Sequence, residues 1–272
     1  MAFHLRRGDA PVLVSMPHVG TTLPEDTAAR LMPPARGLPD TDWLLVELYD
    51  FLPELGVTRL HAEFPRQLID LNRPPDDTPL YATTTTGLVP GELFDGSPAW
   101  QPGEQPDTSE QARLLERYWQ PYHDALSEER ARLCERHGEM LLLDLHSIRS
   151  TVPRLFEGTL PDFNLGTNQG RACPPSLART LEGALHDAPY AQVTDGRFRG
   201  GYITRRYGEP AKGLHALQLE LSQATYMDEG PEPPGVETAV IDAARTDRVR
   251  PWLRAFVEAA LRWILTRVEG SP

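Results

Sequence analysis

Residues 140–147 read MLLLDLHS, an apolar run whose polar residues, Asp144, His146 and Ser147, all lie in its second half. A run of this kind predicts a strand that is buried on both faces, as in the centre of an α/β sheet. Ligands of open α/β sheets bind beyond the carboxyl ends of the strands. The run therefore predicts both the class of fold and the edge of the sheet that carries the functional residues.

Strands and helices are expected to alternate on both sides of this run. The expected strands cover residues 12–16, 58–62, 67–71 and 215–222. The expected helices cover a segment that starts near Asp42 and runs to residue 56, then residues 109–136 with Gly138 as the stop, 176–186 and 249–268. Residues 76–107 are expected to form a long surface excursion, and residues 197–207 a loop or short strand. The alternation predicts an α/β fold, with one domain over residues 1–272 and three αβα layers around a mixed, largely parallel central sheet.

The charge balance argues against a polyanionic partner. The 272 residues include 27 basic and 39 acidic side chains, a formal net charge of −12 at pH 7, which repels nucleic acid and anionic lipid surfaces. We therefore expect neither as a partner, although a few arginines in a cleft would still attract a small anionic substrate. Cys134 and Cys173 lack the spacing of a metal or redox motif. No apolar stretch has signal-peptide or transmembrane length, so a cytoplasmic location is expected.

Histidine and carboxylate side chains stand at the ends of the expected strands. His18 follows the first strand, and His146 stands near the end of the apolar run. Two neutral imidazoles and one carboxylate form a common catalytic zinc set, in which water or substrate takes the fourth position. Asp42 or Asp40 could supply the carboxylate. One histidine at a strand end is usually a hydrogen-bonded structural residue, but two of them favour a metal site.

Three further groups offer acid–base or anion-binding chemistry. Glu220 alternates with leucines, so it faces either solvent or a cleft in which a raised pKa would make it a general base. Arg73, in the segment DLNRPP, could bind a carboxylate bidentately or form a surface salt bridge. The arginines around Gly200-Gly201 form either a second carboxylate site or an ordinary solvated loop; they are Arg197, Arg199, Arg205 and Arg206.

The signatures of several other enzyme classes are absent from the sequence. The chain has no GxGxxG after a strand and no GxxxxGK[ST], the loops that bind nucleotide phosphates. It also lacks the GxSxG turn of serine hydrolases and the HExxH motif of many zinc proteases. Nucleotide binding and serine hydrolysis are therefore not indicated.

Seven segments, taken together and in order, resemble the N-formylglutamate amidohydrolase (deformylase) family. They are PHVG at 17–20, DTDW at 40–43, DLNRPPDDTPLY at 70–81, TTGLVP at 85–90, DLHS at 144–147, GRFRGGYITRRYG at 196–208 and LQLELSQATYM at 217–227. The resemblance extends over almost the whole chain. DLNRPPDD, DLHS and RGGYITRRYG are specific in combination, although each alone would be weak.

The family is similar in fold to the zinc carboxypeptidases, and this likeness implies roles for the matched residues. His18 and His146 would bind Zn²⁺ or another divalent transition metal, and Glu220 would act as the general base. Arg73 would bind a substrate carboxylate, and Asn72 would share that task.

The chain departs from the carboxypeptidase pattern at one metal ligand. Carboxypeptidases carry a glutamate three residues after the first histidine, whereas this chain has Thr21 there. The third ligand is therefore expected to be an aspartate, and Asp42 is preferred over Asp40.

The resemblance implies hydrolysis of N-formyl-L-glutamate to formate and L-glutamate, a step of histidine degradation. This small substrate carries two carboxylates. Arg73 would bind one of them, and Arg199 and Arg205 the other, with Tyr202 as a hydrogen-bond donor. Two alternatives stay open: a zinc amidohydrolase or carboxypeptidase for another N-acyl amino acid or short peptide, and a non-catalytic protein that binds an acidic amino acid.

Overall fold

A seven-stranded mixed sheet forms the centre of the computed structural model, which describes residues 2–80 and 86–270. The strand order is β1-β3-β2-β4-β7-β5-β6. The strands are β1 (Phe3–Arg6), β2 (Val12–Met16), β3 (Thr58–Ala62), β4 (Met140–Ile148), β5 (Phe163–Gly166), β6 (Gln192–Thr194) and β7 (Leu214–Ser222). The four central strands run parallel, whereas β1 pairs antiparallel with β3 and β5 antiparallel with β7. The predicted mixed, largely parallel sheet is confirmed.

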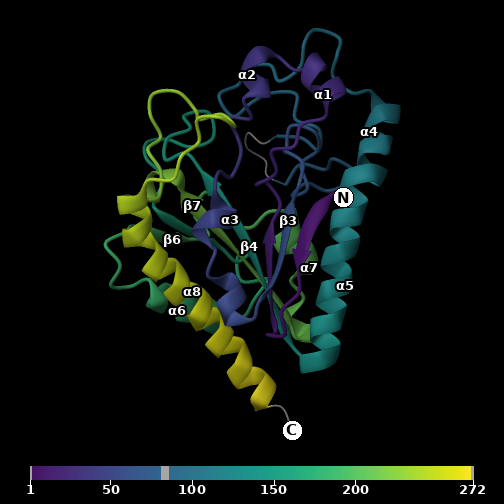
Figure 1. The fold of residues 1–272 in the computed structure, drawn as a ribbon. Helices are drawn as coiled ribbons and strands as arrows, with labels where there is room; N and C mark the ends of the chain where they lie inside the picture. Colours follow the sequence, from purple (N-terminus) through teal and green to yellow (C-terminus); the bar gives the residue numbers. More distant parts are fainter. Residues whose placement is uncertain (1, 81–85, 271–272) are drawn as a thin grey trace.

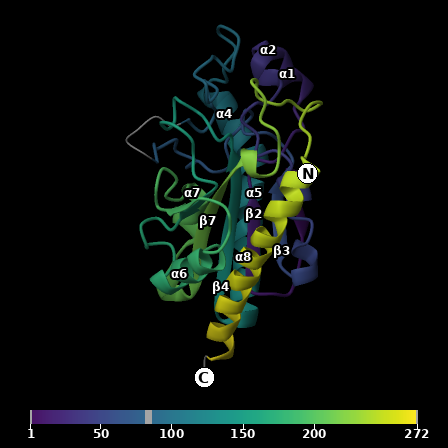
Figure 2. The ribbon, with the colours of Figure 1, turned by 90° about the vertical axis from the view of Figure 1, so that its left-hand side faces the viewer.

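Helices cover both faces of the sheet and complete the predicted three layers (Figure 1). On one face lie α6 (Pro175–Ala184) and α8 (Ala243–Glu269), and on the other α5 (Gln120–His137) and α7 (Tyr202–Tyr207). The shorter elements are α1 (Glu25–Arg30), α2 (Pro33–Arg36), α3 (Leu45–Leu48), α4 (Thr108–Leu114), η1 (Leu52–Leu55), η2 (Leu115–Trp119), η3 (Pro210–Lys212) and η4 (Gln223–Thr225). The side view shows α1 and α2 at the end of the molecule opposite the C terminus (Figure 2).

The residues of β4 divide between the two faces of the sheet. All nine of its residues are buried. Leu141, Leu143 and Leu145 belong to the core on the α6 and α8 face. Because side chains alternate along a strand, Asp144 and His146 point to the opposite face, the one covered by α5 and α7.

The long helix predicted at residues 109–136 is confirmed, with a local irregularity. It consists of α4, the π-helical turn η2 and α5, which follow one another without a break. Asp107 and Glu110 form a capping box at its start, and Gly138, with φ of 81°, ends it. The π-turn shifts the register of the side chains that follow, which brings Trp119 and His123 against the chain at residues 71–73.

The predicted helix from Asp42 to residue 56 is wrong. Leu44 has a left-handed φ of 58°, so regular helix begins only at Leu45 and ends at Leu48. The η1 turn follows, with Pro53 near its start. Asp42 instead lies outside regular secondary structure, and its backbone N–H donates to His18 O at 3.0 Å. The apolar residues of this segment do have helical spacing. The hydrogen bond from Asp42 N to His18 O nevertheless holds the start of the segment in a non-helical conformation.

Two further expectations of local structure are corrected. Residues 67–71 form turns rather than a strand, because Asp70 N donates to Leu88 O in the surface excursion at 2.7 Å instead of joining the sheet. The segment 197–207, expected as loop or short strand, contains the helix α7. The short strands β1, β5 and β6 were missed. The described residues of the excursion, 76–80 and 86–107, contain no helix or strand, as predicted, and residues 81–85 lie outside the described part.

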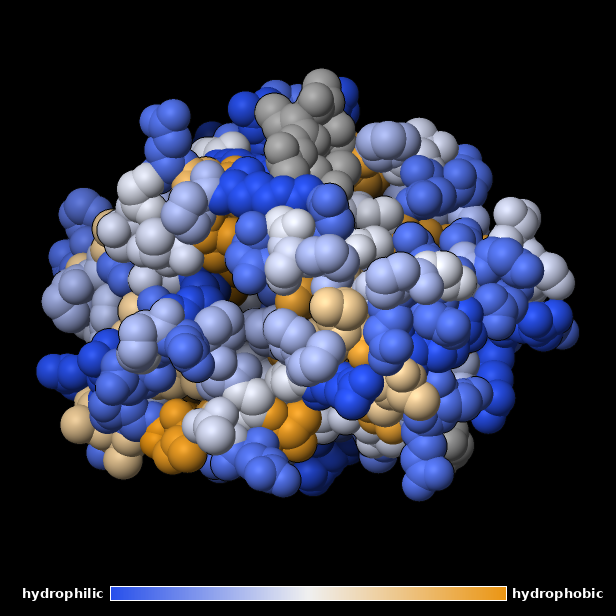
Figure 3. All heavy atoms as spheres, turned by 90° about the horizontal axis from the view of Figure 1, so that it is seen from above, coloured by the Kyte–Doolittle hydropathy of each residue, from blue (hydrophilic) through white to orange (hydrophobic). Residues whose placement is uncertain are grey.

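The end of the molecule above the sheet presents a mostly hydrophilic surface that is hollowed near its centre (Figure 3). No helix among the described residues is long and apolar enough to cross a membrane.

Candidate active site

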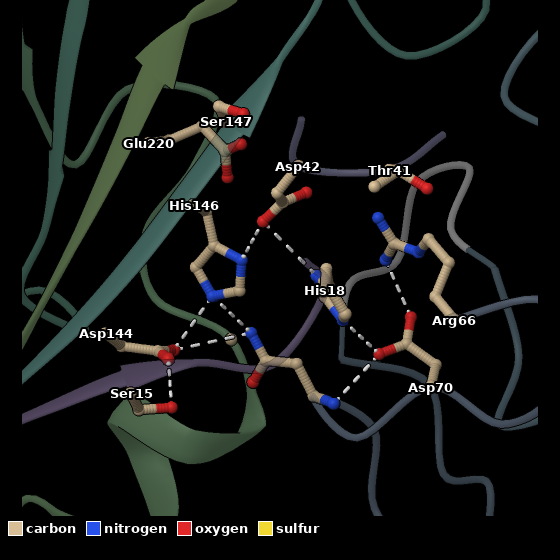
Figure 4. A network of polar contacts seen from close by, with 12 residues as sticks. Ser15, His18, Thr41, Asp42, Arg66, Asp70, Asp144, His146, Ser147 and Glu220 are labelled. Atoms are coloured by element: carbon tan, nitrogen blue, oxygen red, sulfur yellow. Dashed lines mark hydrogen bonds and ion pairs between the residues drawn. The ribbon is translucent and has the colours of Figure 1, made fainter. Parts of the chain in front are cut away.

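His18 follows β2 and lies in a buried position between two carboxylates (Figure 4). Its Nε2 lies 2.7 Å from Asp70 Oδ1, and its Nδ1 lies 3.7 Å from Asp42 Oδ2. Nδ1 has no hydrogen-bond partner among the described residues. Burial, and then the nearby Arg66, lower the pKa of His18, against the opposing effect of Asp70. A buried, neutral imidazole with one unused nitrogen is the form of histidine that binds a metal.

His146 is arranged in the same way on β4. Its Nδ1 lies 2.9 Å from Asp42 Oδ2, and its Nε2 lies 3.0 Å from Asp144 Oδ2. Burial opposes a charge on the ring, but Asp144 and Asp42 outweigh burial and raise the pKa of His146 well above its usual value. Ser15 Oγ donates to the other oxygen of Asp144 at 3.0 Å. The imidazole is therefore fixed by groups on two neighbouring strands.

Asp42, His18 and His146 together form a group with the chemistry of a metal site. All three are buried, and one ligand atom of each lies within 4.8 Å of the others. Each imidazole turns Nδ1 toward Asp42 and Nε2 toward a second carboxylate, and metal-binding histidines generally hold such a partner on the other nitrogen. The buried His18 Nδ1, which has no hydrogen-bond partner among the described residues, is a nitrogen that a metal ion would satisfy. These residues fit a divalent metal with two nitrogen ligands and one oxygen ligand.

Asp40, the other candidate for the third ligand, lies apart from this group. Its Oδ2 accepts a hydrogen bond from Phe94 N at 3.0 Å. Burial raises the pKa of Asp40 to about 7, against the opposing charge of Arg66. The structure thus brings Asp42, rather than Asp40, to the two histidines.

Asp70 supports the site from a fully buried position. It accepts hydrogen bonds from Arg66 at 2.7 Å and from Asn72 N at 2.8 Å, in addition to its contact with His18. Burial would raise its pKa, but Arg73, Arg66 and His18 outweigh burial and hold the pKa of Asp70 well below its usual range. The carboxylate therefore stays charged and orients His18.

Glu220 faces the same cavity rather than bulk solvent. It lies opposite His146 in the parallel register of β4 and β7, and it is 7% exposed. Burial raises the pKa of Glu220 to about 8; His146 opposes this shift and Asp42 adds to it. A carboxylate with a raised pKa is a stronger proton acceptor, as a general base requires. The alternative that the sequence left open, a solvated glutamate, does not describe its position.

A cavity of about 70 Å³ joins these groups. Its lining includes His18, Asp42, His146 and Glu220 at the metal group, and the arginines Arg66, Arg73 and Arg197. Phe94, Ile148, Leu155 and Phe198 supply apolar wall. Cationic side chains beside a buried metal group suit a small anionic substrate.

Of the five residues expected to bind substrate, two line the cavity and three do not. Arg73 and Asn72 line the cavity, and both already have hydrogen-bond partners. Arg73 donates to Thr86 O at 2.8 Å and to Asn72 O at 3.0 Å. Asn72 Oδ1 accepts from Ile203 N at 2.8 Å, and its Nδ2 lies 3.0 Å from His146 Nε2. Asn72 thus contacts a histidine of the metal group rather than offering its amide to a substrate.

The other three expected substrate residues do not line this cavity. Arg199 is exposed and donates to Gly196 O, and Arg205 donates to Gly200 O and Leu80 O. Tyr202 packs against the rings of Trp119 and His123. Arg197 and Arg66 take their place in the lining. Arg197 belonged to the arginine cluster noted in the sequence, whereas nothing in the sequence singled out Arg66.

Sequence comparisons match the chain to one family of known proteins. The sequence profile of the N-formylglutamate amidohydrolase family matches residues 10–227. The N-formylglutamate deformylase of Pseudomonas aeruginosa is 50% identical over 259 residues, 95% of each chain. That of Pseudomonas putida is 49% identical over 84% of this chain and 85% of its own.

Solved structures show the same fold. The crystal structure of N-formylglutamate amidohydrolase from Ralstonia eutropha JMP134 matches with a TM-score of 0.80 at 27% identity, covering 99% of both chains. A protein from Agrobacterium tumefaciens shares the fold with a TM-score of 0.70 at 17% identity, over 98% of this chain and 96% of its own. From the family profile and the close relatives, the chain belongs to the N-formylglutamate amidohydrolase family.

Proposed function

We propose that this chain is a metal-dependent N-formylglutamate deformylase that hydrolyses N-formyl-L-glutamate to formate and L-glutamate in histidine degradation. The observation that supports it most is the buried group of His18, Asp42 and His146, which shares an arginine-lined cavity with Glu220. The names of the two Pseudomonas relatives, which cover most of the chain, favour the same substrate.

We assign Zn²⁺ as the metal, because two imidazoles and one carboxylate are a frequent catalytic zinc set. Zinc supplies a Lewis acid that makes water more acidic and polarises a carbonyl group. His18 and His146 would hold it through Nδ1 together with Asp42. Asp70 and Asp144 orient the two rings through their Nε2 atoms. Residues that support a metal ligand in this way affect metal affinity by about 10–100-fold.

We assign Glu220 as the general base. Its carboxylate accepts a proton from water as the water oxygen bonds to the formyl carbon. It then passes this proton to the amide nitrogen as the C–N bond breaks, which releases formate and the free amino group of glutamate. Its raised pKa and its place in the cavity beside His146 suit both transfers.

We assign Arg73 to one substrate carboxylate and Arg197 to the other, in place of the Arg199, Tyr202 and Arg205 set that the sequence favoured. Both arginines line the cavity. Arg66 adds positive potential from a buried position against Asp70. A guanidinium binds a carboxylate through paired hydrogen bonds that a lysine does not reproduce.

Arg197→Ala is expected to raise KM for N-formyl-L-glutamate by about 10-fold or more, because a hydrogen bond to a charged group contributes about 1.5–3 kcal/mol. The matched control is Arg199→Ala, two residues away and outside the cavity lining, which should leave KM nearly unchanged. Steady-state kinetics of both variants make the measurement. Equal effects of the two substitutions, or a larger effect of Arg199→Ala, would reject the assignment of Arg197.

The proposed function is tested by formate release from N-formyl-L-glutamate, measured before and after chelation and again after zinc is restored. We expect activity to disappear with the chelator and to return with zinc. N-acetyl- and N-succinyl-L-glutamate are assayed in parallel, and a preference for either would favour the wider N-acyl amidohydrolase alternative. If zinc-loaded protein binds glutamate but hydrolyses none of these three substrates, the binding-protein alternative is favoured.

A further inference from the structure

Gln218 lies beside Glu220 but has no place in the reaction described above. It precedes Glu220 by two residues on β7, so both side chains project from the same face of the strand. It is 3% exposed and lines the cavity. Its neighbours Leu217 and Leu219 pack into the core of the opposite face. A buried amide at this position is costly unless both of its ends are hydrogen-bonded.

Both ends of the Gln218 amide have a specific partner. Oε1 accepts a hydrogen bond from Gly201 N at 2.7 Å, and Nε2 donates to Glu220 Oε2 at 3.1 Å. Gly201 N is a donor only, so the amide oxygen must face it. The NH₂ group must then face the Glu220 carboxylate. The opposite orientation would place two donors against each other at Gly201 and two acceptors against each other at Glu220.

The hydrogen bond from Gln218 leaves one oxygen of the base available. Within the described residues, Glu220 Oε1 has no hydrogen-bond partner, and Glu220 lines the cavity. Holding Oε2 restricts the rotation of the carboxylate beside the metal group. Catalytic groups lose much of their effect when they are misplaced by about 1 Å.

The turn that orients Gln218 is itself fixed through the metal group. Asn72 Oδ1 accepts from Ile203 N at 2.8 Å, and its Nδ2 donates to Asp144 Oδ2 at 3.4 Å, the oxygen that contacts His146 Nε2. A Cβ atom at Gly201 would lie 2.3 Å from Asn72 Nδ2, so only glycine permits this approach. The turn at residues 200–203 therefore connects to His146 through Asn72 and Asp144, and to Glu220 through Gln218.

We propose that Gln218 is a positioning residue that fixes the carboxylate of Glu220 relative to the metal-binding histidines, through the turn at residues 200–203. The inference rests on the proposed role of Glu220 as the base. It makes the distance and orientation between base and metal depend on a single buried amide.

The test compares Gln218→Met, which keeps the length of the side chain and removes both hydrogen bonds, with the parent enzyme. We expect kcat for N-formyl-L-glutamate to fall by about 10–100-fold, KM to change by less than about threefold, and metal content and Tm to stay close to those of the parent. The control is Gln192→Met on the edge strand β6, whose amide donates to Glu182 O outside the cavity; it should leave kcat unchanged. An unchanged kcat in Gln218→Met, or a fall explained by lost metal, would overturn the proposal.

A double variant separates this inference from the proposed function. If Gln218 acts through Glu220, adding Gln218→Met to Glu220→Gln should lower kcat little further, because the two effects are not additive. A full additional 10–100-fold loss in the double variant would overturn the positioning role. Unchanged turnover in Glu220→Gln alone would instead reject Glu220 as the base, which is a failure of the proposed function.

Discussion

Glu220→Gln is expected to lower kcat for formate release by about 10²–10⁴-fold, the usual contribution of general acid–base catalysis. Glutamine has nearly the same shape as glutamate but does not accept a proton at neutral pH. The buried position of Glu220 raises its pKa to about 8, which makes its carboxylate a stronger proton acceptor than an exposed glutamate. KM should change little, because the substrate carboxylates are assigned to arginines.

The same variant should retain its metal, since Glu220 is not part of the group formed by His18, Asp42 and His146. Metal analysis of the purified variant checks this, and Tm checks that it is folded. Loss of metal on substitution would identify Glu220 as a ligand. Normal turnover would reject its role as the base.

The sequence predicted the edge of the sheet that carries the site, because the position of polar residues at the end of an apolar run is a local property. Side chains alternate between the two faces of a strand, so Asp144 and His146 share one face of β4, and Gln218 and Glu220 share one face of β7. The pairing of His146 with Glu220 is a property of the sheet register. It is this register that decides between a cavity and solvent for Glu220, and the sequence alone left the two possibilities open.

The arginines of the cavity were harder to predict because contacts of irregular segments, some of them distant in the sequence, place them. The helix α7 begins where Asn72, 131 residues earlier in the chain, accepts from Ile203 N. This contact replaces the expected loop or strand with a helix and carries Arg205 away from the cavity, while Arg197 stays in its lining. Arg66 enters the site through its hydrogen bond to Asp70. Neither contact leaves a periodic signal in the sequence.

Substitution of the third metal ligand is expected to have a second large effect, on metal affinity. The two candidate aspartates, Asp42 and Asp40, differ in their surroundings. Asp42 lies between the two histidines, with Oδ2 at 2.9 Å from His146 Nδ1. Asp40 uses Oδ2 to accept from Phe94 N, a contact that an asparagine oxygen would preserve. Burial already raises the pKa of Asp40 to about 7, so a neutral side chain at that position should cost little.

We therefore expect Asp42→Asn to lower metal affinity by more than about 100-fold, beyond the 10–100-fold typical of residues that only support a ligand, and to abolish formate release at ordinary zinc concentrations. Asp40→Asn should keep both metal and turnover. Zinc titration of the two metal-free variants, followed by formate assay, makes the comparison with side chains of equal size. Metal loss in Asp40→Asn with retention in Asp42→Asn would reverse the assignment. Retention in both would show that the two histidines hold the metal with a different third ligand.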